Sequence, residues 1–304
     1  MKNSVFIFLA IAVSCTGLVP DKQLSAKEEE PVPEKADSID VNITLKAEHH
    51  YPFDITIRET DLFIYDSEGT REMISHRHFN CRPEQIPPTV RLAGGSRSRI
   101  FVAICNFPYN FNMKALRQFD SMLLLSLMFQ DEDPSAPVLS GFAEYNPCSS
   151  GDSPGTVIHL SPLMCTVTLD SVSNALDGYG LLENPQVYLS GCNPEAELLR
   201  EKDFRPKEEL EEDYPVRLPY DIGFYTQNPG TRLFCYPNDT PEDILGVSRT
   251  RIVFECVING AACRFSETLP PFGRGSIISA GITVFSPDEA LWEISPRYSP
   301  SQTQ

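Results

Sequence analysis

Residues 39–46 read IDVNITLK, a stretch in which apolar and polar side chains alternate at every position. The apolar members are Ile39, Val41, Ile43 and Leu45. Successive side chains of a β-strand point to opposite faces of a sheet, so this alternation predicts a strand with one buried face and one solvated face. We therefore expect a half-buried sheet to begin near residue 39.

Strand patterns recur along the rest of the chain. Residues 62–65 and 100–105 are apolar on both faces, which predicts central strands covered on both sides. Further strand patterns occupy residues 138–145, 157–169, 187–189, 231–236, 251–258, 262–265 and 278–284, and a tail follows from residue 295. Asn259-Gly260 fits a type I′ hairpin turn between two of them.

One helix is predicted after Asn112, which can cap its first turn. Leu116, Phe119, Leu123 and Leu127 then repeat at spacings of three and four residues, as on the apolar face of a helix. The 26 prolines exceed the usual share of about 5%, which favours turns over long helices. The predicted fold class is therefore all-β, with one short helix in the first half.

The length of 304 residues allows two domains of roughly 130 residues each. Several short strands separated by turns favour two β-sandwiches in tandem. We predict a signal peptide over residues 1–14, a lipidated N-terminus and disordered tether over 15–38, an N-terminal β-sandwich domain over 39–173 and a C-terminal β-sandwich domain over 174–304.

The N-terminus carries an export pattern. Lys2 precedes an apolar run over residues 5–13, which is too short to span a membrane but suits the core of a signal peptide. Ala12-Val13-Ser14-Cys15 resembles the bacterial lipobox, although leucine is usual where Ala12 stands. Cys15 is therefore the predicted lipidation site, and its acyl chains would give stable membrane anchoring. The alternative is an ordinary signal peptide with an incidental cysteine.

The net charge limits the classes of partner that we expect, and the cysteine content limits the disulfides that can form. The formal net charge of −17 repels polyphosphate, so nucleic acid is not an expected partner. Nine cysteines are present, and assigning Cys15 to lipid leaves an even number, which permits disulfides in an exported protein. Cys105, Cys165 and Cys256 lie in apolar strand patterns, which favours mostly free thiols and leaves any pairing open.

The histidines give no support for catalysis. None of the five lies in an HExxH motif or beside a plausible nucleophile elbow. His76, His78 and Cys81 have a spacing that suits a metal but lack an evident fourth ligand. Trp292 could stack on a sugar or pack at the edge of the last strand. We predict no enzyme activity, no cofactor, and no catalytic, cofactor-binding or metal site.

Several segments, taken in order, resemble the FimB-like anchor or minor subunits of type V fimbriae of Bacteroidales. Residues 60–69 resemble the family's second strand and its turn glycine, and residues 101–106 its central strand. In the second half, residues 234–238, 250–254, 258–260 and 269–270 follow the family in order. Residues 163–169 depart from it, because two basic positions of the family's motif are missing.

The resemblance implies two transthyretin-like β-sandwiches and a lipid-anchored anchor or minor subunit at the outer membrane, which tethers and terminates the filament. Its implied partners are other fimbrial subunits, bound by β-strand addition. Similar stalk subunits lose their first strand to an arginine-specific protease, but no arginine lies between Cys15 and Ile57. We therefore expect the first strand to be retained.

Two other functions stay open. The first is a cell-surface adhesin or glycan-binding lipoprotein at the fimbrial tip, with surface glycans or proteins of host or bacteria as partners. Its site would lie on loops such as residues 106–136 or 193–218. The second is a secreted hydrolase, which would need acidic or nucleophilic groups clustered in a pocket.

Overall fold

The computed structural model describes residues 38–47, 55–87, 89–93, 97–147, 155–204, 209–211, 213–241 and 248–298. These residues belong to one compact unit. The predicted signal peptide, Cys15 and almost all of the predicted tether lie outside the described residues. The division into domains over 39–173 and 174–304 stays a prediction.

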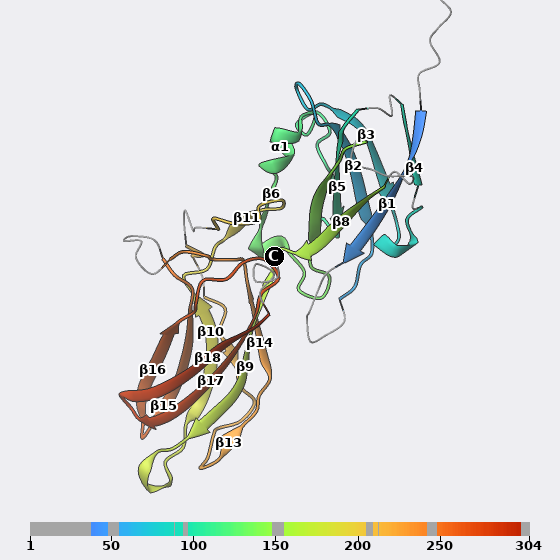
Figure 1. The fold of residues 1–304 in the computed structure, drawn as a ribbon. Coiled ribbons are helices and arrows are strands. Elements are labelled where there is room, and N and C mark those ends of the chain that lie inside the picture. Colours follow the sequence, from blue (N-terminus) through green and yellow to red (C-terminus); the bar gives the residue numbers. More distant parts are fainter. Residues whose placement is uncertain are drawn as a thin grey trace, which may run out of the picture. The chain divides into compact units, whose positions relative to one another are not determined.

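Most of the regular elements in the described residues are β-strands (Figure 1). The first half contains β1 (Ser38–Ala47), β2 (Thr60–Asp66), β3 (Met73–Phe79), η1 (Pro83–Gln85), β4 (Thr89–Ala93), β5 (Arg99–Cys105), α1 (Phe119–Leu123), β6 (Ser126–Met128), η2 (Phe129–Asp131), β7 (Leu139–Tyr145) and β8 (Gly155–Pro162). The second half contains β9 (Cys165–Asn174), η3 (Asp177–Tyr179), β10 (Glu183–Ser190), β11 (Glu195–Glu197), β12 (Val216–Arg217), β13 (Thr226–Gln227), β14 (Thr231–Cys235), β15 (Arg251–Ile258), β16 (Ala261–Thr268), β17 (Ile277–Ser286) and β18 (Glu289–Tyr298). The predicted all-β class is confirmed.

A seven-stranded sheet organises the described part of the first half, in the order β3-β2-β5-β7-β8-β1-β4. One of its faces forms a core to which β1 and β4 contribute together with β2 and β5, so the sheet curls around its own apolar side chains. The other face of β2 and β5 packs against α1 and against residues 196–204. Both strands are therefore buried on both sides, as their unbroken apolar runs predict.

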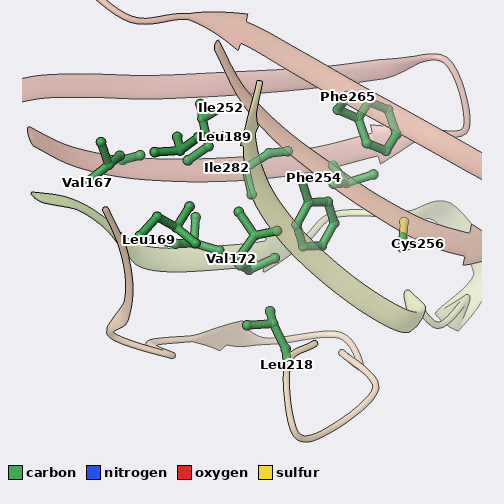
Figure 2. Packing of buried hydrophobic residues seen from close by; sticks show 14 of the residues in the cluster. Val167, Leu169, Val172, Leu189, Leu218, Ile252, Phe254, Cys256, Phe265 and Ile282 are labelled. Atoms are coloured by element: carbon green, nitrogen blue, oxygen red, sulfur yellow. The ribbon is translucent and has the colours of Figure 1, made fainter. Parts of the chain in front are cut away.

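Two sheets form the sandwich of the second half. One has the order β13-β9-β17-β18, with β14 also paired to β9, and the other has the order β12-β10-β15-β16. Figure 2 shows their side chains meeting in one core, with Leu169 of β9 and Ile282 of β17 from one sheet and Phe254 of β15 from the other. This packing of two inner faces is the β-sandwich expected from the strand patterns.

Residues 157–169, predicted as one strand, form parts of two strands in different sheets. β8 ends at Pro162, whose nitrogen carries no hydrogen to donate to a ladder. β9 starts at Cys165 and pairs with β14 and, in parallel, with β17. The apolar pattern runs across the break because the residues on both sides of it are buried, so the change of sheet could not be predicted from this pattern.

The predicted helix is shorter than expected. The side chain of Asn112 accepts a hydrogen bond from the Ala115 amide at 3.3 Å, but this closes a turn and not a helix. Gln118 has extended backbone angles and bridges to Glu72, so α1 begins only at residue 119. Leu127 lies in β6, where it pairs with β11. The apolar stripe was a correct guide to burial and a wrong guide to the extent of the helix.

The predicted tail from residue 295 is also partly wrong, because β18 continues to Tyr298. β18 is an edge strand of its sheet, and its residues alternate between exposed and half-buried. A strand of this kind carries a weak apolar signal, since only one of its faces meets the core.

The cysteines of the described residues are free thiols: Cys81, Cys105, Cys165, Cys192, Cys235, Cys256 and Cys263. Burial raises the pKa of Cys105, Cys165 and Cys256 to about 12, so these side chains are neutral at physiological pH and pack as small apolar groups. This arrangement agrees with the preference for mostly free thiols. Cys148 lies outside the described residues.

The Asn259-Gly260 turn has positive φ angles of 52° and 79°, as a type I′ hairpin requires. Gly260→Ala is expected to lower the free energy of unfolding by about 1 kcal/mol through backbone strain alone, because an added Cβ would meet no atom within 4 Å. Urea denaturation measures the loss. Gly273→Ala is the matched control, since that position is equally open but does not have a positive φ. Equal losses in the two variants would contradict the assignment to strain.

Candidate assembly site

β1 lies inside the first sheet and not at its edge. Its first half pairs antiparallel with β4, from Ser38 to Asn42, and its second half pairs in parallel with β8, from Asn42 to Ala47. Val41, Ile43 and Leu45 are buried in the core, and the side chains between them are exposed. The alternation predicted from the sequence is therefore confirmed, and β1 joins two strands that would otherwise not be neighbours.

The β3 edge of this sheet carries polar side chains. His76 Nε2 and His78 Nδ1 lie 2.7 and 3.1 Å from the same Asp61 oxygen on β2. Hydrogen bonds to Asn80 and Asp61 raise the pKa of His78, which favours its charged form. Charged groups on an edge strand hinder unwanted pairing with another chain.

His76, His78 and Cys81, whose spacing suits a metal, do not form a set of metal ligands in the structure. In the ranges that the structure describes, no group of three or more His, Cys, Asp or Glu side chains could hold a metal ion. The two histidines are instead tied to Asp61, while the Cys81 carbonyl accepts a hydrogen bond from Thr60 at 3.2 Å.

Trp292 packs and does not form an open platform. It lies on β18 opposite Ile282 of β17 and is half-buried against the core of the second sandwich. Of the two interpretations of this residue, packing at the last strand is the one that the structure supports.

The two loops considered for an adhesin site are packed together. Met128 and Ser126 of β6 pair with Glu195 and Glu197 of β11, and the Leu198 amide donates to the Leu125 carbonyl at 2.8 Å. A mainly apolar hollow of about 160 Å³ lies beside this contact, and its lining includes Phe129, Pro134, Leu210 and Tyr214. Residues 125–128 and 195–198 thus contact one another across the two halves of the chain.

A buried arginine, Arg274, forms hydrogen bonds that link this contact to the first sheet. Arg274, which precedes β17, donates to the carbonyls of Leu198 at 2.8 Å, Ser140 at 3.1 Å and Ser161 at 2.7 Å. Ser140 lies on β7 and Ser161 on β8, so the arginine of the second half holds two strands of the first sheet. Arg274 could not be predicted from the sequence, because a single arginine between two glycines resembles an ordinary loop.

Glu132 lies near this arginine and is itself buried. Its Oε1 accepts a hydrogen bond from the Val138 amide at 2.8 Å. Burial raises the pKa of Glu132 to about 7, and the Tyr236 hydroxyl, the Val138 amide and the Arg274 charge limit that rise. Arg274 and Glu132 are both buried, and the charge of Arg274 acts on Glu132; we call the two residues the buried arginine–glutamate pair.

The described residues include no helix long and apolar enough to cross a membrane. Cys15, the predicted lipidation site, lies outside the described residues, so its acylation stays a prediction.

Solved structures resemble this fold over most of the chain. The fimbrilin FimA from Porphyromonas gingivalis W83 matches with a TM-score of 0.58 at 7% identity, covering 85% of this chain and 97% of that one. The chain shares the fold of fimbrial proteins. The tip fimbrial protein Mfa3 from P. gingivalis gives a TM-score of 0.55 at 13% identity, covering 85% and 99% of the two chains. A fimbrial assembly protein from Parabacteroides distasonis ATCC 8503 gives 0.54 at 14%, covering 85% and 98%.

No protein-family model matches the chain, and no curated protein matches its sequence. The resemblance to fimbrial subunits is therefore confirmed at the level of the fold. The solved structures just compared are described as fimbrial proteins and not as enzymes.

Proposed function

We propose that the protein is a non-enzymatic subunit of a cell-surface fimbrium, and more specifically a lipid-anchored anchor or minor subunit that ends the filament at the outer membrane. The similarity to fimbrial proteins supports the general role. The position of β1 supports the more specific role, that of an anchor or minor subunit that ends the filament. A subunit accepts another subunit's strand where its own sheet has an unfilled place, and here β1 fills the place between β4 and β8.

The partners in this proposal are other fimbrial subunits, which would meet this protein by β-strand addition elsewhere on its surface. The lipid on Cys15 would hold the assembly to the outer membrane. Mass measurement of the protein isolated from the cell surface tests whether β1 is kept. A mature N-terminus after residue 46 would contradict the anchor proposal, because the protein would then have lost β1 as stalk subunits do.

Cys15→Ala is expected to release the protein and its fimbriae into the medium, because the acyl chains that hold them would be absent. The measurement is the share of fimbrial protein in the culture supernatant, together with labelling by a fatty-acid analogue. Cys81→Ala is the matched control and should leave both unchanged. Fimbriae that remain firmly bound to cells with Cys15→Ala would contradict the anchor role.

An adhesin at the fimbrial tip is the second candidate function. One observation favours it: Tyr220, Phe224 and Tyr225 are each more than half exposed within six residues of chain. An exposed aromatic cluster of this kind is uncommon on a monomer surface and often marks a binding site.

A further inference from the structure

Three of the exposed aromatic side chains of the second half lie on the segment between β12 and β13. Tyr220 is 71% exposed, Phe224 66% and Tyr225 56%, and Leu181 beside them is 45% exposed. We call residues 220–225 the aromatic loop, and it leads directly into β13 (Figure 1). Three large rings in six residues expose apolar area that folding leaves in water, which calls for a role outside the core.

The aromatic loop is firmly held. Ile222 at its centre is fully buried, and its amide and carbonyl both bond to Leu182 at 3.0 Å. The Asn174 side chain donates to the Ile222 carbonyl at 2.8 Å. The Asn184 amide donates to Asp221 Oδ1 at 2.8 Å. The rings are therefore exposed because the backbone between them is held against the core by Ile222. The loop is already ordered, so binding a ligand would not require it to become ordered.

Polar side chains border the rings. Gln227 donates to the Tyr225 hydroxyl at 3.0 Å, and Arg217 donates to the Asn184 side chain. Asp221 is exposed beside Tyr220. The surface thus combines apolar ring faces with amide, carboxylate, guanidinium and hydroxyl groups, which can donate and accept hydrogen bonds.

We propose that the aromatic loop binds a neutral saccharide. A sugar ring has an apolar face of C–H groups, which can lie on a tyrosine or phenylalanine ring, and hydroxyls at its rim that both donate and accept hydrogen bonds. The side chains of Asp221, Gln227 and Arg217 supply partners of both kinds. This proposal deepens the second candidate function and does not depend on the anchor role.

Other occupants fit less well. The net charge of −17 disfavours anionic membrane surfaces and phosphorylated ligands. An added strand would need a sheet edge of several residues, but β13, the edge strand that follows the loop, has only two residues. A neutral, hydroxyl-rich ligand needs neither a basic surface nor a free edge.

The test uses the mature chain with Tyr220→Ala, Phe224→Ala and Tyr225→Ala combined. The probes are yeast mannan, chitotriose and glycans released from gastric mucin, with binding measured by titration calorimetry. We expect the unaltered protein to bind at least one probe, and the triple variant to bind it at least tenfold more weakly. Phe285→Ala on β17, where the ring is 42% exposed, is the matched control and should bind normally.

Three results would overturn the proposal: no binding of any probe by the unaltered protein, equal binding by the triple variant, or a protein that dimerises in ultracentrifugation unless the three rings are removed. The last result would make the loop an interface between copies. Tyr220→Ala alone covers the case in which the triple variant misfolds, since its ring is the most exposed of the three. The release assay with Cys15→Ala is independent, so the fimbrial and saccharide proposals can fail separately.

Discussion

Ile43→Asp is expected to lower the free energy of unfolding by roughly 3 to 5 kcal/mol, because it places a carboxylate without a partner in an apolar core. Ile43 is 6% exposed and lies between Val41 and Leu45, which face the same core. Urea denaturation at pH 7 measures the loss. β1 should be the first element to detach, since its pairing with β4 and β8 depends on these three side chains.

Thr44→Asp is the matched control, because the neighbouring residue on β1 faces solvent. The same charge there should cost less than about 1 kcal/mol. Similar losses in the two variants would contradict the burial of alternate residues of β1.

The same variant tests strand addition directly. A peptide with the sequence of residues 38–47 should restore stability to Ile43→Asp in proportion to the logarithm of its concentration, because it binds the folded state at the place that β1 has left. The unaltered protein should not respond to the peptide, since its own strand occupies that place. Equal stabilisation of both proteins would contradict this account of the filled sheet.

Arg274→Met is expected to lower the free energy of unfolding by about 3 to 5 kcal/mol at pH 8, because it removes one charge of a buried pair and the donors that serve several buried carbonyls. Arg274 is 7% exposed and bonds to Leu198, Ser140 and Ser161. The two halves of the chain should then unfold in separate transitions, which calorimetry would resolve.

The loss should be smaller at pH 5. The folded-state pKa of Glu132 is about 7, above its usual 4.5, so its contribution to stability is fully present below pH 4.5 and is lost as the pH rises through 7. Because each pKa unit corresponds to about 1.4 kcal/mol, this rise amounts to about 3 kcal/mol. Removing Arg274 raises the pKa of Glu132 further, since the arginine lowers it.

Arg297→Met is the control for arginine loss. Arg297 pairs with Asp170 at 2.6 Å, but its side chain is 54% exposed. Exposed ion pairs contribute at most about 1 kcal/mol, so this variant should change stability little at either pH. A loss at Arg274 that is equally small, or that does not depend on pH, would contradict the structural role of the buried arginine–glutamate pair.

Strands that bury a regular apolar pattern could be predicted from the sequence, whereas three of the edge strands could not. β2 and β5 show unbroken apolar runs because both of their faces are covered, and β15 and β16 are marked by the Asn259-Gly260 turn. β3, β4 and β18 were missed. Their pairing rests on backbone hydrogen bonds, which leave little trace in the order of side chains.

The candidate site could also be predicted only in part, because only some of its residues lie in a regular apolar pattern. β1 was found by its alternation, although its neighbours β4 and β8 could not be named. Arg274 acts through carbonyls of residues far away in the chain, so no local pattern marks it. The aromatic loop was visible as Tyr220, Phe224 and Tyr225, but only the burial of Ile222 shows that those rings must face outward.

The parallel pairing of β1 with β8 also bears on the order in which the protein can fold. Residues 42–47 leave the ribosome, and cross any membrane, before the residues 155–160 with which they pair. β9 and β17 repeat this arrangement, because residues 166–174 must wait for residues 277–284. Contacts of such long range form slowly and leave apolar strands uncovered in the meantime. The sheets that contain β1 and β9 are therefore completed only after the later strands β8 and β17 have been synthesised. In a polypeptide whose synthesis is interrupted, β1 or β9 would stay unpaired and accessible to chaperones and proteases.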